Sequence, residues 1–380
     1  MSINNSLIKI DRKVALHASV KHDALEKIIN KLTLINPFLI PYRKKEKWGF
    51  CNKNKDIIID CIYDWVDPFK DGLARVYLAK KIGLIDIDNN VVVSCIYDSI
   101  WPFSEELACF ELDGKLGFID KKGYVIIQAK YEKQGFRFPH HNLFSGGIAC
   151  VKANNKWQYI NKTGKEIGPK IYDYIFPFID NIADIQLNGK YGCIDKEFNL
   201  IIPCTYDKRL FFFNGLARIQ INNREGLMNL QEQNVIPCMY DSVLGFSEGL
   251  ASVSYNNHWG FINKENIPIV PFIYNHQTCS FYEGLAIVGK DGKDSKMGYI
   301  DKQGNEVIPF KYDLASTFSE GLAKVKVGFN EWSFIDKKGV EIIPPIYEWP
   351  SSFENGLASV SINGKYGGYI NKQGIQFWED

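Results

Sequence analysis

The sequence lacks several features that identify particular classes of protein. It has almost no net charge, because 45 lysine and arginine residues stand against 44 aspartate and glutamate residues. This balance argues against a dedicated nucleic-acid-binding protein, whose phosphate contacts require a surplus of cations. No apolar run approaches the roughly 18 residues that span a membrane. The first ten residues lack the basic and then apolar order of a secretion signal.

Paired cysteines and catalytic motifs are missing as well. The nine cysteines form no Cys-x-x-Cys pair, which fits reduced thiols and predicts a cytoplasmic protein. The chain contains no Gly-x-Ser-x-Gly motif, no phosphate-binding glycine loop and no His-Glu-x-x-His motif. We therefore expect a protein that is not an enzyme and that holds no metal or cofactor.

What the sequence has in abundance is repetition. Its 380 residues are 46% hydrophobic and 23% charged, which is enough to bury a large core. If the Trp48-Gly49 step is taken as an anchor, its second position recurs at spacings of 34, 34, 41, 34, 34, 34, 38, 35 and 35 residues. The ten anchor positions are Gly49, Gly83, Gly117, Gln158, Gly192, Gly226, Gly260, Gly298, Ser333 and Gly368. A period of this length indicates a repeat architecture of ten units.

Each unit repeats one order of short segments. The anchor is followed by an apolar residue with Asp or Asn, a turn, a Val-Ile-Pro-like segment, and in nine of ten units a tyrosine 14 residues after the anchor. A phenylalanine and a Gly-Leu-Ala step come next, as in residues 246–251. Apolar residues alternate in these segments, so we predict three short strands per unit. Proline in the third segment removes a backbone donor and should lie at a sheet edge.

Most side chains that could carry chemistry follow the same period. The turn aspartates, such as Asp120 and Asp301, have no second carboxylate at catalytic or ligand spacing. We expect them to cap turns. In the Tyr-Asp step, as in Tyr240-Asp241, we expect the ring to stack between units and the acid to cap the next turn. Four cysteines lie two residues before the tyrosine, where we expect small buried hydrophobic residues: Cys61, Cys95, Cys204 and Cys238.

Two sets of residues depart from the period and are candidate binding residues. Seven extra residues lie between Tyr131 and Phe144, and aromatic and arginine side chains in such a loop suit an interface. The aromatic side chains there could equally fold back onto the array. The loop candidates are Phe136, Arg137, Phe138, His140 and His141. A second set follows the tyrosine of three units, and could line one rim or belong to the core: Trp65, Trp101 and Trp349.

Residues 1–37 precede the array and have a different pattern. Leu25, Ile28, Ile29 and Leu32 would share one face of a helix. Residues 1–47 contain ten basic and four acidic side chains. We predict a basic helical segment over residues 1–37 that caps the first unit or docks a partner, and a ten-unit array over residues 38–380.

The repeated motifs resemble those of the WG-repeat family (KWG-type repeats) of bacterial proteins. A unit of that family reads approximately Lys-Trp-Gly-Phe-Ile-Asp-Lys-x-Gly, then Val-Ile-Pro-x-x-Tyr-Asp and Phe-x-Glu-Gly-Leu-Ala. Residues 47–50, 258–263 and 307–313 are close copies of parts of it. The resemblance implies an all-β array but no particular activity, because such repeats occur in proteins of many kinds.

The arrangement of the units is left open by the sequence. Closed rings usually have four to eight blades of four strands, so ten three-stranded units fit a superhelical stack at least as well as a propeller-like ring. The chain also ends without an evident strand to close a ring.

The predicted function follows from an extended repeat surface with variable loops. We expect a non-catalytic scaffold that binds another protein through rim loops and repeat faces. The alternative is a ligand-sensing or enzyme-accessory module that holds a small molecule in a channel or on a rim. Neither hypothesis involves nucleic acid or a membrane.

Overall fold

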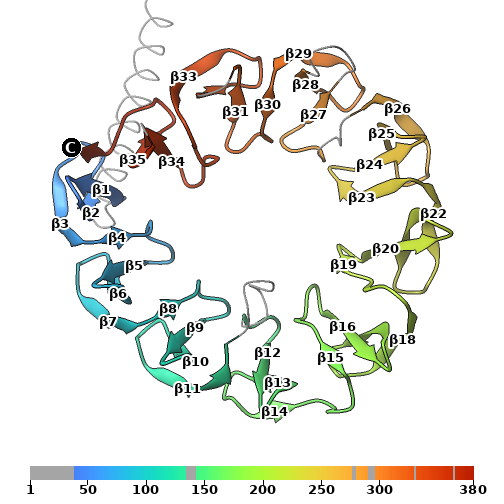
Figure 1. Ribbon diagram of the computed structural model, residues 1–380, viewed down its shortest axis with the longest axis horizontal. Helices are drawn as coiled ribbons and strands as arrows, with labels where there is room; N and C mark the ends of the chain where they lie inside the picture. The colour runs from blue at the N-terminus through green and yellow to red at the C-terminus, as the bar shows by residue number, and fades with distance from the viewer. Residues whose placement is uncertain (1–37, 134–142, 276–279, 290–295, 329–330, 363) are drawn as a thin grey trace, which may run out of the picture.

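The computed structural model describes residues 38–133, 143–275, 280–289, 296–328, 331–362 and 364–380. All regular structure within these ranges is β, arranged as ten sheets. The sheets follow one another around a closed ring, with the C-terminal end beside the first strand (Figure 1). The predicted all-β repeat array is therefore confirmed, and its units form a closed ring and not an open superhelical stack. The predicted helical segment 1–37 lies outside the described residues.

Each sheet is one blade of the ring, numbered here in chain order. Blade 1 consists of β36 (Trp378–Glu379), β1 (Ile40–Lys44), β2 (Lys47–Cys51) and β3 (Ile57–Tyr63); blade 2 of β4 (Trp65–Val66), β5 (Leu73–Leu78), β6 (Lys81–Asp86) and β7 (Val91–Tyr97). Blade 3 consists of β8 (Ser99–Ile100), β9 (Leu107–Leu112), β10 (Lys115–Asp120) and β11 (Val125–Glu132); blade 4 of β12 (Ile148–Ala153), β13 (Lys156–Asn161) and β14 (Glu166–Ile167). Blade 5 consists of β15 (Tyr174–Ile175), β16 (Ile182–Leu187), β17 (Lys190–Asp195) and β18 (Leu200–Tyr206); blade 6 of β19 (Phe212–Phe213), β20 (Leu216–Ile221), β21 (Arg224–Asn229) and β22 (Asn234–Tyr240).

The remaining blades follow the same order. Blade 7 consists of β23 (Ser242–Ser247), β24 (Leu250–Tyr255), β25 (His258–Ile262) and β26 (Pro268–Tyr274); blade 8 of β27 (Ala286–Gly289), β28 (Met297–Ile300) and β29 (Glu306–Tyr312). Blade 9 consists of β30 (Leu314–Ala315), β31 (Ala323–Lys326), β32 (Trp332–Ile335) and β33 (Glu341–Tyr347); blade 10 of β34 (Leu357–Ile362) and β35 (Lys365–Asn371).

Most blades have a fourth strand that the sequence did not predict. It is the innermost one, and in blade 2 it is only the two residues of β4. A two-residue strand is too short to show an alternating pattern. Figure 1 shows β4, β8 and β23 on the side of their blades that faces the centre. We call the residues between the tyrosine of one unit and the Gly-Leu-Ala step of the next the inner segment, and all inner segments together the inner wall.

The outermost strands confirm the prediction for proline. Pro237 lies in β22 and Pro271 in β26, each at the outer end of its sheet, and both residues are exposed. The missing backbone donor therefore faces outward, where no further strand pairs with it in this sheet order.

The anchor glycine is needed because the third strand passes very close to it. A Cβ atom on Gly226 would lie 2.5 Å from the carbonyl oxygen of Ile236. The one unit with a large anchor residue, Gln158, has a third strand of only two residues, Glu166–Ile167. Ser333 is a smaller departure, and the strand opposite it keeps its full length as β33.

The turn aspartates act as caps, as predicted. Asp301 Oδ1 accepts hydrogen bonds from the backbone N–H groups of Gln303 and Asn305 at 2.9 and 2.8 Å. Gly304 in the same turn has a φ of +83°, a left-handed conformation that glycine adopts without strain. The Tyr-Asp acids also cap the following hairpin, since Asp241 Oδ2 accepts from the N–H of Asn257 at 2.9 Å.

Aromatic rings join neighbouring blades. The phenylalanine of each inner segment packs on the residue after the anchor of the preceding blade, as in Phe261–Phe281, whose ring centroids are 4.7 Å apart. The buried Tyr240 of blade 6 donates a hydrogen bond to Asn266 Oδ1 of blade 7 at 2.7 Å. The interpretation of the repeated tyrosines as packing residues between units is therefore confirmed.

Charged side chains add a second tie between blades. Glu248 of blade 7 accepts from the backbone N–H of Gly284 in blade 8 at 3.2 Å and pairs with Lys302 at 2.9 Å. The same arrangement joins blades 3 and 4, 8 and 9, and 9 and 10. The acids and lysines there are Glu105 with Lys162, Glu283 with Lys337, and Glu320 with Lys372.

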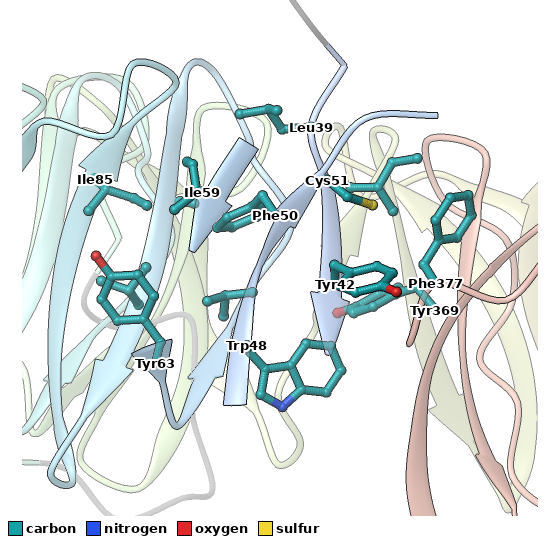
Figure 2. Close-up of a cluster of buried hydrophobic side chains, with 14 of the residues drawn as sticks. Leu39, Tyr42, Trp48, Phe50, Cys51, Ile59, Tyr63, Ile85, Tyr369 and Phe377 are labelled. Carbon is teal, nitrogen blue, oxygen red and sulfur yellow. The ribbon is translucent and has the colours of Figure 1, made fainter. Parts of the chain in front are cut away.

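The ring is closed by the last strand, contrary to the expectation from the sequence. Strand β36 pairs in parallel with β1, so that Arg43 lies opposite Trp378. Phe377 is 1% exposed, and Figure 2 shows it beside Tyr42 and Tyr369. The segment begins as a third strand, with a bridge from Gln376 to Ile370, and then leaves its own blade for the first. The tenth unit has no tyrosine 14 residues after its anchor, so the repeat pattern gave no sign of this departure.

Candidate functional site

The structure places the sequence-predicted candidates in different surroundings. The loop residues Phe136, Arg137, Phe138, His140 and His141 lie outside the described residues, and their role stays a prediction. Trp65 is half-buried, with ring centroids 4.7 Å from Trp48 and 4.5 Å from Tyr366. Trp101 is half-buried against the core that blades 3 and 4 share. Trp349, by contrast, is 73% exposed. Two of the three tryptophans are therefore packed against neighbouring side chains, and the third is exposed.

One cavity lies where the ring closes. It has a volume of about 720 Å³ and is lined by inner segments of blades 2, 3 and 10 and by Tyr369. Two of its charged groups pair with each other, since Arg75 Nε lies 2.6 Å from Asp67 Oδ2, and Trp65 Nε1 donates to Asp67 Oδ1 at 3.1 Å. Because Arg75 also donates to the carbonyl of Ile100 at 2.8 Å, this ion pair is part of the contact between blades 2 and 3.

A second cleft, of about 520 Å³, lies between blades 6 and 7 on the inner wall. Its floor is apolar and includes the buried Leu227 and Val243. Three cations line it: Arg209, Arg218 and Lys264. Among the described lining residues there is no aspartate or glutamate. The cleft therefore combines apolar side chains with three cations.

Phe211 at the edge of this cleft has an unusual conformation. It has a φ of +53° and is 53% exposed. Positive φ is rare for a bulky side chain and stores strain. In the inner segments of blades 2, 3 and 5 the corresponding position holds proline, namely Pro68, Pro102 and Pro177. The frame therefore does not require a phenylalanine here.

Arg209 is held rigidly beside Phe211. Its Nε donates to the buried carboxylate of Asp184 at 2.5 Å. Its guanidinium lies over the rings of Phe176 and Phe211, with the carbon atom 3.8 and 4.8 Å from the ring centroids. Burial, followed by the charge of Asp184, raises the pKa of the neighbouring Cys193 thiol far above its ordinary value.

Arg218 lacks a contact that its counterparts in other blades make. The same repeat position holds Arg75 in blade 2, which donates to the carbonyl of Ile100 at 2.8 Å, and Lys324 in blade 9, which donates to the carbonyl of Pro350 at 2.7 Å. Both carbonyls belong to the inner segment of the next blade. Arg218 is instead 3.7 Å from Glu225, and its side chain is 54% exposed.

The inner segment of blade 7, which faces Arg218, also differs from those of blades 3 and 10. Strand β23 has a bulge between Val243 and Phe246, where Gly245 replaces the proline of other units. Glu225 Oε2 accepts from the N–H of Val243 at 2.9 Å and holds the bulged segment in place. Among the described residues, Arg218 donates no hydrogen bond to the carbonyl of Val243, the residue that corresponds to Ile100 and Pro350, and its guanidinium lines the cleft.

Lys264 is also without the partner that the repeat normally supplies. The corresponding lysines in blades 8, 9 and 10 pair with a glutamate of the preceding blade. In blade 6 that glutamate is replaced by Asn214, and the described residues give Lys264 no ion pair. This site was not among the candidates predicted from the sequence, although the run Arg209-Leu-Phe-Phe-Phe213 is a visible departure from the repeat.

Two further observations concern other kinds of site. Across the described ranges, no three His, Cys, Asp or Glu side chains are grouped as metal ligands. The same ranges contain no helix that is long and apolar enough to cross a membrane.

Several solved structures resemble the chain at low sequence identity. A eukaryotic initiation factor aligns with a TM-score of 0.47 and 9% identity, over 90% of this chain and 95% of that one. BamB from Moraxella catarrhalis aligns with a TM-score of 0.31 and 8% identity, over 89% and 95%. The extracellular domain of a one-component system from B. thetaiotaomicron aligns with a TM-score of 0.32 and 12% identity, over 90% and 57%. No curated protein sequence matches the chain.

The family model of the WG containing repeat matches nine consecutive segments. They are residues 48–81, 82–115, 117–157, 159–191, 191–224, 226–257, 259–293, 297–328 and 332–366. Each segment starts within one residue of an anchor. The tenth anchor, Gly368, follows the end of the ninth segment. Strand β1 at one end of the chain, and β36 at the other, lie outside them and meet where the ring closes. Because the matches cover most of the chain, it belongs to the WG-repeat family, as its motifs predicted.

Proposed function

We propose that this β-propeller is a non-catalytic scaffold that binds another protein, with the inner wall as its binding face. The observation that carries the proposal is that the inner wall varies while the frame repeats. From the second residue after the tyrosine, the inner segments read Trp-Val-Asp-Pro at residues 65–68, Ser-Ile-Trp-Pro at 99–102 and Leu-Ala-Ser-Thr at 314–317. Different side chains on a rigid repeating frame are typical of a recognition surface.

The proposed setting is the bacterial cytoplasm. It suits the eight cysteines of the described residues, all of which are free thiols. No nucleic acid or membrane is part of the proposal, because the chain carries a net charge of only +1.

A photo-crosslinking experiment tests the proposal. A photoreactive amino acid is placed at Trp349 or Tyr282, which are exposed on inner segments, and at Ile126 or Ile269 on outer strands as matched controls. We expect a protein adduct in the native cell from the inner positions only. Absence of an inner adduct, or equal adducts from both faces, would contradict the proposal.

The second candidate function is a sensor for a small molecule. The volume of the cleft between blades 6 and 7, about 520 Å³, lies within the range of roughly 300–1,000 Å³ that small-molecule sites occupy. A thermal-shift screen with metabolites distinguishes the two functions. Stabilisation of the purified protein by a metabolite, without an inner crosslink to protein, would favour the sensor.

A further inference from the structure

We propose that the cleft between blades 6 and 7 recognises a carboxylate next to an apolar side chain, on an acidic segment of the partner protein. This inference rests on the proposed function and names the chemistry of the partner.

The positive charge of the cleft is only partly compensated by the fold. Asp184 neutralises Arg209 through the contact at 2.5 Å. Glu225 is the acid nearest to Arg218, but it also accepts from the N–H of Val243 and the hydroxyl of Ser242. Arg218 and Lys264 therefore remain available to an incoming anion. Charge-assisted hydrogen bonds to a carboxylate are about twice as strong as neutral ones.

The surface beside the cations suits an apolar group. Phe211 contributes an exposed ring, and Leu244 on the bulge of β23 also lines the cleft. Leu227 and Val243 close the floor beneath them. A partner residue with an aliphatic or aromatic side chain can cover this surface while a neighbouring carboxylate reaches Arg218. Arginine can bind a carboxylate through two parallel hydrogen bonds, which fixes the orientation of the segment.

Phe211 gives an independent reason to assign a binding role. Its left-handed conformation is one that asparagine adopts with less strain. An aromatic residue that is strained and half exposed adds little to the stability of the propeller when no partner is bound. Such outliers gather at binding sites, where the surrounding structure holds them in place.

The first test uses a library of random peptides selected on the intact protein. We expect the retained peptides to carry Asp or Glu next to an apolar residue. In titrations with the best peptide, Arg218→Gln and Lys264→Gln should each weaken binding at least tenfold. The matched control is Lys337→Gln, which removes a lysine at the same repeat position in blade 9, where it pairs with Glu283. That variant should bind the peptide as the parent does.

The second test separates binding from folding. In the variant Phe211→Asn the melting temperature should stay the same or rise, because the strain is relieved, while peptide affinity falls at least tenfold. If the Phe211 side chain had a purely structural role, the variant would instead have a lower melting temperature and an unchanged peptide affinity. That result would overturn the assignment of Phe211.

The outcomes distinguish this inference from the proposed function. Peptides that lack acidic residues, or that bind the Arg218→Gln and Lys264→Gln variants as tightly as the parent, would overturn the inference and leave a binding scaffold in place. Free phenylacetate that binds the cleft when no peptide is retained would also overturn it, in favour of the sensor. The crosslinking experiment with Trp349 and Tyr282 tests the scaffold without involving the cleft.

Discussion

Replacing Phe377 by alanine should loosen the ring where it closes. Phe377 is 1% exposed, and its backbone N–H donates to the carbonyl of Tyr369 at 2.9 Å. Truncation of a buried phenylalanine costs about 3–5 kcal/mol. Unfolding entropy is about 2.1 cal/mol/K per residue, or about 0.7 kcal/mol/K for the roughly 340 residues of the ring, so the melting temperature should fall by about 4–7 °C.

The control lies two residues earlier on the same segment. Ile375 is 46% exposed, so Ile375→Ala should change the free energy of unfolding by no more than about 0.5 kcal/mol. Both variants are measured by thermal unfolding, with small-angle scattering to detect an opened ring. Equal melting temperatures for the two variants would refute the reasoning, because the ring would then be held together without the last strand.

Three further predictions concern the frame. Partial burial raises the pKa of Glu248, Glu283 and Glu320, but their lysine partners and backbone N–H donors outweigh it, so each pKa lies below the ordinary 4.5. The stabilising effect of these ionised carboxylates is therefore complete above pH 4.5 and lost as the pH falls below it. A triple Glu→Gln variant should show a smaller drop in melting temperature on acidification than the parent protein does. Burial raises the pKa of the Cys150 thiol well above its ordinary value. Thiol reagents at neutral pH should therefore modify Cys150 only after unfolding. Mass spectrometry of labelled peptides would show an adduct before unfolding if this is wrong. Gly226→Ala should destabilise the protein by about 1–3 kcal/mol, because the new methyl group meets the Ile236 carbonyl, whereas Gly245→Ala, with nothing within 4 Å, should unfold at the parent temperature.

Local interactions made much of the frame predictable from the sequence. The offset of 14 residues between Gly260 and Tyr274 follows from pairing within one hairpin, where β25 and β26 place Trp259 opposite Tyr274. Turn caps such as Asp301 need only residues two and four positions away. Features of this kind repeat with the period, so ten copies make them visible in a single sequence.

The candidate site could not be predicted in the same way, because it consists of contacts that are missing between blades. Arg218 looks like Arg75 in the sequence, but Arg75 binds the inner segment of the next blade, whereas Arg218 faces the bulged β23 without that hydrogen bond. Lys264 differs from Lys337 only through Asn214, a residue 50 positions earlier that belongs to the neighbouring blade. The absence of a partner becomes evident when the register between blades is known.

The sequence by itself determined the unit: its strands, its turns, its packing residues and its family. The tertiary structure decided how the units meet. A small change in the angle between neighbouring blades separates a superhelix from a ring. Closure depends on the sum of ten such angles, and this sum cannot be predicted from the residues of one unit. The ring closes because β36 finds its partner in β1, more than 300 residues away in the chain, and pairing over that distance depends on the geometry of every blade between them.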